Sequence, residues 1–541
     1  YRFCYLLIYL LIKKINIGNI LNVKIALSKI KGAPPMKNSI RTVIVSTILL
    51  TIFSCTTSTD APLPITSASE EALELFKRGY FHQSQNEWYE ARGLYEQALS
   101  LDPEFILANL YVPETDPNKR KAFRDRAIAN KNNGNEAEKL RVEIYVANRD
   151  GRLMDVVTVS KELVNKYPNS SEAYVVLGNA YTSVRDFDNA ISQFNKALKI
   201  NPDQYRAWRS LAAHQVNIGN NILLPKSRQT KALALKYTKG MVKSRPKAPF
   251  SYQLQANVER QYSDFAAAKP LYQKMVDVAE ETGSSMKGSA YNVFAHNYLF
   301  DGDSKTAREN YDKAIALSKT PLAVVNLTFY KLQAYLFQND YEGALRVAQD
   351  LDSKLNTLGF SEASLYQQKA RVEFMRFIAY ANNQQKEEAF TALSARKNYA
   401  TAAMSLMEID EVIQRNFDSF NAQMEAWHYI LFGEYDKAEE QLKKLYPIAS
   451  KIQSPSALDD YNALSGMVRL FTGDTPGSLS YFNENINPEN YQYYAYFKGL
   501  ALKQAGQEKE AMAIFDYISN YNFNSWEAAL VRSLAKKQLG S

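Results

Sequence analysis

Residues 171–202 read SEAYVVLGNAYTSVRDFDNAISQFNKALKINP, and this stretch predicts two short helices that pack against each other. Gly178 and Ala190 are small, which lets the two helices cross closely at these positions. Phe194 is large enough to fill the space between one helix pair and the next. Pro202 ends the second helix, because it has no N–H to donate and its ring clashes with the preceding turn. The stretch therefore encodes one helix–turn–helix unit.

The same spacing recurs along the chain. Ala234 and Ala268 stand at the small position of neighbouring units, 34 residues apart, as a repeated unit requires. The clearest other units contain Gly79, Ala91, Tyr95, Ala98 and Pro103; Tyr252, Ala256, Ala268 and Tyr272; and Tyr291, Phe294, Ala295, Tyr298, Ala307, Tyr311 and Ala314. Weaker copies centre on Ala344, Ala389, Ala438, Ser478 and Ala511. We therefore interpret most of the chain as an array of such units.

The repeat resembles the tetratricopeptide repeat (TPR). Eight residues of the quoted stretch stand at the family's spacings: Tyr174, Leu177, Gly178, Tyr181, Ala190, Phe194, Ala197 and Pro202. The resemblance implies an all-α fold in which about eleven TPR helix pairs stack into a right-handed superhelical solenoid. We divide it into an N-terminal TPR array at 70–285 and a C-terminal TPR array at 286–540.

Three segments depart from the regular repeat. Residues 217–228 (NIGNNILLPKSR) predict a loop between units. Residues 397–418 predict an extra helix, because the spacing between units is long there. Residues 525–540 predict a last amphipathic helix, with Trp526 facing inward, which would close the end of the solenoid as a cap.

The composition excludes several classes of protein. The 541 residues include 46% hydrophobic and 23% charged residues, with only 21 Gly and 18 Pro, which favours a folded and mostly helical chain. The formal net charge is +8, from 65 basic and 57 acidic residues. Residues 1–54 hold eight of the basic residues and no acidic one, so the remainder has 57 of each and is neutral. A nucleic-acid partner is therefore not expected.

The N-terminal region predicts a lipid anchor. The first Met is Met36, so we interpret residues 1–35 as translation upstream of the native start. Residues 36–54 resemble a lipoprotein signal peptide, with two basic residues, an apolar run and then Ile52-Phe53-Ser54-Cys55. The resemblance implies lipidation of Cys55 and a flexible tether at 55–69. A plain signal peptide or an uncleaved anchor is the alternative, because Phe53 replaces the usual small residue.

Catalytic signatures are not found in the sequence. It contains no HExxH, GxxxxGK[ST] or GxSxG motif. The four His are far apart and Cys55 is assigned to the anchor, so we predict no metal site, no cofactor and no enzyme activity. Acidic pairs such as Asp459-Asp460 are interpreted as solvated surface charge, because neighbouring helical residues point in different directions.

The inner face of the first helix in each pair is the expected partner-binding groove, as the TPR resemblance implies. Carried onto this chain, the groove residues are Asn179, Arg206, Arg209, Gln253, Asn257, Arg260, Asn292, His296, Asn326 and Gln333. Asn and Gln there could hydrogen-bond the backbone of an extended peptide. An ordinary polar helix surface is the alternative, and His296 is interpreted as a satisfied groove or core histidine rather than as a ligand. Farther along, the groove becomes apolar, with Phe374, Ile378, Phe420, Trp427, Ile430, Leu470, Phe471 and Tyr496, which indicates packing or protein docking.

These features favour a non-enzymatic, membrane-tethered TPR scaffold that binds a protein or extended peptide. The lipoprotein resemblance implies a periplasm-facing position, lipid-anchored to the Gram-negative cell envelope, with the outer membrane favoured. The alternative is a glycan-binding outer-membrane lipoprotein similar to the SusD-like family, which also combines a lipid anchor with TPR units. That family builds its sugar site from long insertions, whereas the repeats here run nearly end to end.

Overall fold

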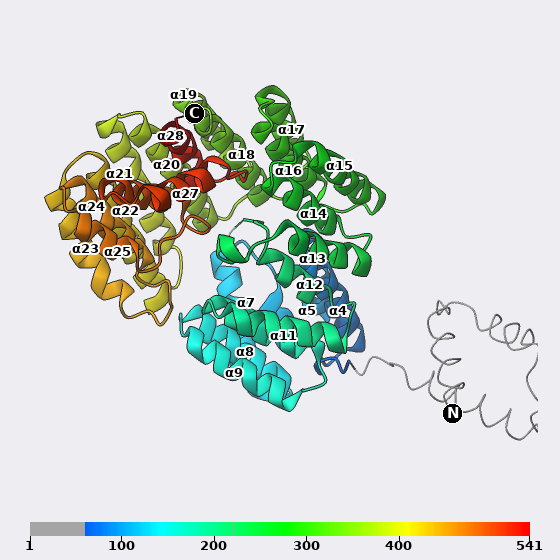
Figure 1. Cartoon of the computed structure of the whole chain (residues 1–541). Helices are drawn as coiled ribbons and strands as arrows, with labels where there is room; N and C mark the ends of the chain where they lie inside the picture. The colour runs from blue at the N-terminus through cyan, green and yellow to red at the C-terminus, as the bar shows by residue number, and fades with distance from the viewer. Residues whose placement is uncertain (1–59, 220, 541) are drawn as a thin grey trace, which may run out of the picture. The chain divides into compact units, whose positions relative to one another are not determined.

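The computed structural model describes residues 60–219 and 221–540, and within these ranges every regular element is helical (Figure 1). Most helices are 13 to 17 residues long, three to five turns each. The α-helices are α4 (Glu70–Ser84), α5 (Trp88–Leu101), α6 (Ile106–Tyr111), α7 (Pro117–Ala129), α8 (Glu136–Arg149), α9 (Leu153–Lys166), α10 (Ser171–Ser183), α11 (Phe187–Ile200), α12 (Tyr205–Ala213), α13 (Lys231–Ser244), α14 (Pro249–Gln261), α15 (Phe265–Glu281), α16 (Lys287–Phe300), α17 (Ser304–Ala316), α18 (Pro321–Leu336), α19 (Tyr341–Leu355), α20 (Glu362–Asn382), α21 (Lys386–Ser405), α22 (Glu411–Leu431), α23 (Tyr435–Ala449), α24 (Asp459–Phe471), α25 (Thr475–Phe482), α26 (Gln492–Gln504), α27 (Glu508–Ser519) and α28 (Trp526–Gln538). Consecutive helices pack as antiparallel pairs and form the predicted all-α solenoid of helix–turn–helix units.

The pair α10–α11 shows why the repeat folds as it does. Arg185 adopts a positive φ of 60°, which reverses the chain between the two helices. Asp186 caps α11, because its carboxylate accepts a hydrogen bond from the Asn189 N–H at 3.2 Å. Gly178 lies against the ring of Phe194, and a Cβ on Gly178 would come within 2.7 Å of Phe194 Cδ1. The predicted close crossing of the two helices is confirmed.

Other helix pairs repeat this geometry. Gly79, Gly466 and Gly499 face the rings of Tyr95, Phe482 and Phe515 in the same way. An Asp also caps the second helix of several pairs, where its carboxylate accepts a hydrogen bond from the N–H three residues later. These caps are Asp264, Asp303, Asp340 and Asp474. In these pairs the core is therefore built from the same few positions that the spacing predicted.

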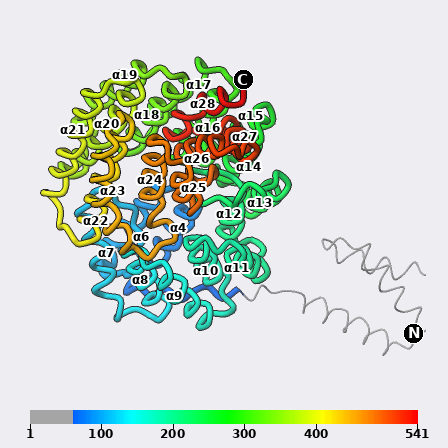
Figure 2. Tube along the Cα trace, turned by 60° about the vertical axis from the view of Figure 1, so that its left-hand side comes forward, coloured from blue at the N-terminus to red at the C-terminus, as the bar shows by residue number. Residues whose placement is uncertain are grey.

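Units far apart in sequence lie side by side (Figure 2). Arg185 Nη2, after α10, is 3.0 Å from the carboxylate of Asp459 at the start of α24. The Lys226 N–H donates to Glu489 at 2.6 Å, in a loop that follows α25. Lys121 of α7 pairs with Glu408, 2.8 Å away, between α21 and α22. The solenoid thus curves until units of its first half contact units of its second half.

A helix follows the last repeat where the sequence predicted one, and the predicted extra helix is not found. Helix α28 begins at Trp526, whose ring packs 5.4 Å from Trp427 and 5.7 Å from Phe374. Residues 397–418 do not form a separate helix, and that prediction was wrong. Instead, α21 and α22 are 20 and 21 residues long and take up the additional sequence themselves.

Part of the predicted tether lies on the solenoid. Of residues 55–69, those from Asp60 onward are described, and they have no regular secondary structure up to the start of α4. The carboxylate of Asp60 accepts hydrogen bonds from the Ser171 N–H at 2.8 Å and from the Asn201 amide at 2.8 Å. Leu63 is only 4% exposed, so this segment packs onto the helices rather than standing away from them.

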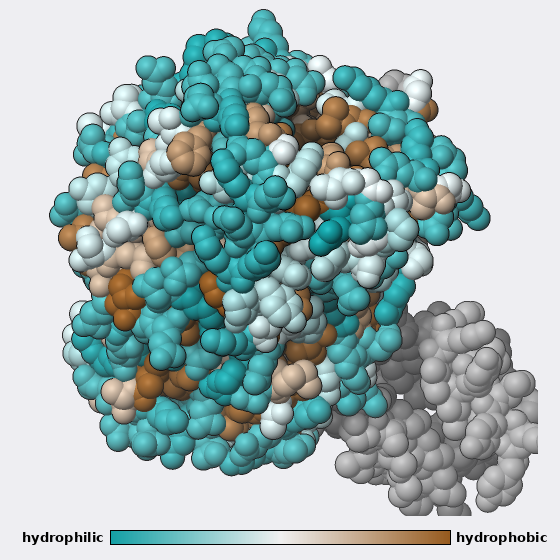
Figure 3. Space-filling view, turned by 90° about the vertical axis from the view of Figure 1, so that its left-hand side faces the viewer, coloured by the Kyte–Doolittle hydropathy of each residue, from teal (hydrophilic) through white to brown (hydrophobic). Residues whose placement is uncertain are grey.

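The predicted signal peptide, the upstream residues 1–35 and the lipidation residue Cys55 lie outside the described residues. Among the helices of residues 60–540, none combines the length and the apolarity that crossing a bilayer needs. The face in Figure 3 is mostly hydrophilic, with apolar side chains in small scattered groups.

Candidate functional site

The curved solenoid surrounds a central cavity of about 1200 Å³. Its wall comes from helices α5, α14, α16, α18 and α20 together with the start of α28. Residues of several loops contribute to the wall, among them 113–116, 217–219, 318–320, 359–361 and 489–490. These parts come from the beginning, middle and end of the described residues, so the cavity depends on the curvature of the whole solenoid.

Seven of the ten predicted groove residues line this cavity. They come from the first helices of successive units, α14, α16 and α18, whose inner faces point the same way. The seven are Gln253, Asn257, Arg260, Asn292, His296, Asn326 and Gln333. The structure therefore brings together most of the residues that the repeat frame selected.

The other three predicted groove residues do not line the cavity, and each forms hydrogen bonds with other residues of the chain. Arg206 pairs with Glu172 and also donates to the Tyr80 hydroxyl of α4. Arg209 donates to the Ser84 carbonyl and to the side chain of Asn86, each at 3.0 Å. Asn179 accepts a hydrogen bond from Ser210 at 3.0 Å. Helix α4 packs against Arg206 and Arg209 and covers them, whereas Asn179 is exposed on α10, away from the cavity.

A segment that the sequence did not point to fills another part of the groove. Residues 521–524, Tyr-Asn-Phe-Asn, connect α27 to α28 and are at most 8% exposed. Asn522 donates to the Arg260 carbonyl at 3.1 Å, and Asn524 donates to the Tyr330 carbonyl at 2.9 Å. The alternation of Asn with aromatic residues was the available signal, but it does not say which surface it would bind.

Polar atoms in the cavity wall differ in whether they have partners. Asn257 is fully engaged, since it accepts from the Tyr272 hydroxyl at 2.7 Å and donates to the Asn217 carbonyl at 3.1 Å. Within the described residues, no partner lies within hydrogen-bond distance of Asn292 Oδ1, His296 Nε2 or Gln333 Oε1. These three side chains are only 5–7% exposed. Because these three atoms line the cavity, a ligand or an ordered water that enters it can bond them.

The cavity wall contains a buried cation, Arg260, and a neutral imidazole, His296. Burial lowers the pKa of His296 well below its usual value, and the nearby charge of Arg260 lowers it further. His296 is therefore uncharged near pH 7 and can offer one donor or one acceptor. Arg260 is 1% exposed, and its guanidinium donates to the Val293 carbonyl at 3.1 Å.

The apolar continuation of the groove is filled by the chain's own cap. Trp427 is 2% exposed, donates to the Tyr493 hydroxyl at 2.9 Å and packs against Trp526 of α28. Ile378 and Tyr496 are likewise buried. Phe471 is the exposed member of the set, at 42%. Packing is therefore the role of most of these residues.

The acidic pair Asp459 and Asp460 forms hydrogen bonds within the protein. Asp459 is 3% exposed and bonds Arg185 and the Tyr491 hydroxyl, so its predicted place on the solvated surface was wrong. Burial raises the pKa of Asp460 to about 6, and this residue accepts a hydrogen bond from Tyr494 at 3.3 Å. Across residues 60–219 and 221–540, no cluster of three or more His, Cys, Asp or Glu side chains could hold a metal ion.

Comparison with known proteins identifies the repeat. Family models described as "Tetratricopeptide repeat" match residues 171–204 and 288–321. These ranges hold the helix pairs α10–α11 and α16–α17. No curated protein matches the chain.

Several solved structures resemble parts of the chain at low TM-score. MamA (41-end) from Desulfovibrio magneticus RS-1 is 23% identical over 34% of this chain and 96% of its own, with a TM-score of 0.27. A tetratricopeptide repeat protein from Parabacteroides merdae ATCC 43184 is 14% identical over 56% and 98%, with a TM-score of 0.30. The APC/C hetero-tetramer Cut9-Hcn1 is 14% identical over 87% and 80%, with a TM-score of 0.33. The matched repeats and the helix pairs together show that the chain is an all-α solenoid built from tetratricopeptide repeats.

Proposed function

We propose that this protein is a non-enzymatic scaffold that is tethered to a membrane in the Gram-negative cell envelope and holds a protein segment in its central cavity. Tetratricopeptide repeats support the general kind of activity, which is protein–protein interaction. The observation that carries the proposal is the row of buried amide and imidazole groups without partners, Asn292, His296 and Gln333, in the wall of a cavity of about 1200 Å³.

A peptide backbone is the ligand chemistry that suits these groups. Each peptide unit offers one N–H and one C=O, and amide side chains can bond both. Because the amides come from successive units, they can follow an extended chain from α14 to α18. Such contacts read the backbone with little regard to side chains, which suits a scaffold.

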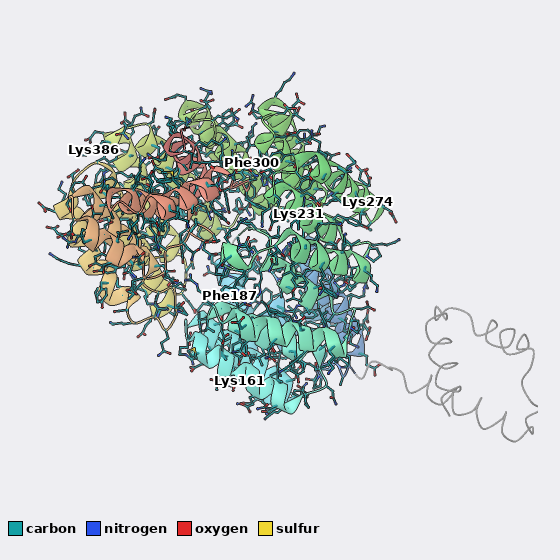
Figure 4. The ribbon with its side chains drawn as sticks, in the orientation of Figure 1. Lys161, Phe187, Lys231, Lys274, Phe300 and Lys386 are labelled. Atoms are coloured by element: carbon teal, nitrogen blue, oxygen red, sulfur yellow. The ribbon has the colours of Figure 1, made fainter. Side chains whose placement is uncertain are left out.

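The test of this proposal is the capture of a partner from intact envelopes, with the protein tagged at its C-terminus. We expect Asn292→Trp, which fills the cavity, to reduce the captured partner by at least about tenfold, equivalent to about 1.4 kcal/mol of binding free energy. Lys274→Trp is the matched control, because Lys274 is exposed on the outer side of α15 (Figure 4). Helical content measured by circular dichroism verifies that both variants fold. Equal capture by wild type and Asn292→Trp would contradict the proposal.

The tether is tested separately. The acyl chains expected on Cys55 would hold the protein at the membrane, since two chains are sufficient for stable anchoring. We expect the Cys55→Ala variant to move from the membrane pellet to the soluble fraction, whereas the wild-type protein remains in the pellet. A variant that still sediments with the membrane would exclude a lipid anchor at this residue.

A glycan ligand is the second candidate, and one observation favours it. Trp88 and Tyr89 line the cavity and are 47% and 52% exposed, so they could stack on a sugar ring. Soluble glycans would then raise the melting temperature of the wild type. If the ligand is a glycan, Trp88→Ala should abolish that rise in melting temperature. In the capture experiment, Asn292→Trp should then capture the same proteins as the wild type.

A further inference from the structure

We propose that the exposed side of helices α11 and α13 lies against the membrane and binds anionic phospholipid headgroups through Lys199, Lys236, Lys239 and Lys243. These four side chains are named the basic surface. The inference rests on the proposed membrane tether and adds which face of the solenoid the tether holds at the bilayer. It follows from the charge of one stretch of the chain and from the place where the tether enters the fold.

Basic residues are concentrated in residues 189–258. This stretch holds twelve Lys and Arg but a single acidic residue, Asp203, whereas the chain from residue 55 onward is neutral as a whole. Helix α13 alone carries four Lys and no Asp or Glu. The neutrality of the chain therefore hides one strongly positive region, which attracts anions of every kind.

The four lysines of the basic surface are exposed and unpaired. Lys236, Lys239 and Lys243 recur at helical spacing along one side of α13, and Lys199 lies in the last turn of α11. Within residues 60–219 and 221–540, no carboxylate forms an ion pair with any of the four. The carboxylates nearby pair instead with other basic residues: Glu172 with Arg206, Asp188 with Arg228, Glu259 with Lys231 and Glu281 with Lys247.

The two helices of the basic surface meet through Trp208 of α12 (Figure 1). The Trp208 indole donates to the Pro202 carbonyl, just after α11, at 2.8 Å. The same indole lies against Gly240 of α13, where an added Cβ would overlap the ring. Tyr237 of α13 also packs against the apolar cluster that contains Leu198 of α11. The lysines beside these contacts therefore belong to one continuous surface.

The tether enters the fold beside the basic surface. The Asp60 carboxylate accepts a hydrogen bond from the Asn201 amide at 2.8 Å, and Asn201 follows Lys199 by two residues at the end of α11. Five peptide units separate Cys55 from Asp60, and they span about 18 Å at most. An acylated Cys55 would therefore keep the end of α11 close to the headgroups.

The neighbouring surfaces suit an anionic bilayer less well. Helix α15, the second helix of the next unit, exposes Asp277, Glu280 and Glu281 toward its C-terminal end. On the other side, Lys166 of α9 lies 2.6 Å and 3.3 Å from two carboxylates, which neutralise it. The unpaired positive charge is thus confined to the part of the solenoid where the tether enters.

The chemistry of the basic surface suits a bilayer better than a single bound anion. A lysine ammonium is a point charge on a flexible stem, and several of them attract anionic headgroups by summed attraction rather than by one fixed geometry. This attraction is screened by salt and falls off within about 8 Å at physiological ionic strength. The basic surface would therefore orient a protein that acyl chains already anchor.

The test is photo-crosslinking of the full chain in reconstituted vesicles. A photoreactive amino acid replaces Lys239 or, as the control, Lys443 of α23, which is also exposed and has no ion pair among the described residues. The vesicles contain phosphatidylcholine alone or with an equal amount of phosphatidylglycerol. With phosphatidylglycerol present, we expect at least about fivefold more lipid adducts from position 239 than from position 443. Without it, the excess at position 239 should disappear.

Substitution of the other three lysines then places the effect at the basic surface. The variant combines Lys199→Gln, Lys236→Gln and Lys243→Gln. The matched control removes the same charge from exposed sites on α15, α17 and α27, with Lys274→Gln, Lys305→Gln and Lys509→Gln. Lipid adducts from position 239 should fall at least about threefold in the variant and persist in the control. Circular dichroism verifies that both proteins fold, and the two vesicle compositions decide the question on otherwise wild-type protein as well.

The outcomes separate this inference from the tether. A protein that sediments with both kinds of vesicle but gives equal adducts from positions 239 and 443 rejects the basic surface and leaves the tether standing. A protein that sediments only with phosphatidylglycerol, and crosslinks from position 239, supports the basic surface and rejects the tether. An equal fall in the control variant overturns the inference. In intact envelopes, a protein adduct from position 239 without lipid adducts would assign this surface to an acidic protein and also overturn it.

Discussion

Replacing Glu172 with Gln is expected to lower the free energy of unfolding by about 3–5 kcal/mol, the cost of removing one partner from a buried ion pair. The Glu172 side chain is 14% exposed and pairs with Arg206, while the Arg141 guanidinium lies 3.5 Å away and is 5% exposed. The Tyr80 hydroxyl also donates to Glu172 at 2.5 Å. The substitution would leave two arginines next to each other without a counterion. Urea unfolding followed by circular dichroism measures the change.

The stabilisation that Glu172 contributes depends on pH in a defined way. Burial alone would raise the pKa of Glu172, but the charges of Arg206 and Arg141 and the hydrogen bonds from Tyr80 and Arg206 together outweigh burial, so the folded-state pKa is lowered from 4.5. The stabilisation is therefore fully present above the unfolded pKa and is lost as the pH falls through the lower folded value. In Glu172→Gln this part of the acid sensitivity should disappear. An unchanged acid profile would contradict the account.

An exposed ion pair supplies the control for Glu172. Asp350 lies 2.7 Å from Lys354, and the two side chains are 65% and 59% exposed. Solvent screens such a pair, so Asp350→Asn should change the free energy of unfolding by less than about 0.5 kcal/mol. A loss as large as that of Glu172→Gln would show that charge removal in general destabilises this chain.

The second large effect is expected at the helix crossing. Gly178→Ala should lower the free energy of unfolding by about 1–3 kcal/mol, because the added Cβ would overlap the Phe194 ring and force α10 away from α11. Gly93 lies in α5 with nothing within 4 Å of an added Cβ, so Gly93→Ala should stabilise the chain by about 0.5–1 kcal/mol. Gly→Ala is thus expected to lower the free energy of unfolding at position 178 and to raise it at position 93. The midpoint of urea unfolding measures both effects. Midpoints that shift in the same direction in the two variants would contradict the packing of α10 against α11.

Local features of the fold could be predicted because they depend on a few residues close in sequence. Gly178 and Phe194 lie 16 residues apart and meet within one helix pair, and the cap at Trp526 follows from the end of the repeats. The closure of the solenoid could not be predicted in this way. Arg185 and Asp459 are 274 residues apart, and their meeting depends on the summed rotation of every unit between them.

The candidate site shows the same division. Asn292 and His296 lie one helical turn apart on α16, so the repeat frame alone puts them on the inner face. Whether that face stays open depends on distant segments. Helix α4 covers Arg206, and residues 521–524 cover the carbonyls of Arg260 and Tyr330, which no local pattern indicates. The sequence therefore predicted the inner face, and the structure was needed to find the part of it that is open.

The most direct test of the central claim is site-specific photo-crosslinking in intact envelopes. A photoreactive amino acid replaces Gln253, in the cavity wall, or Lys274, exposed on α15, in otherwise wild-type protein. The account predicts a discrete adduct of the same partner from position 253 and none from position 274. Adducts from position 274 alone, or equal adducts from both positions, would contradict the claim that the central cavity is the binding site.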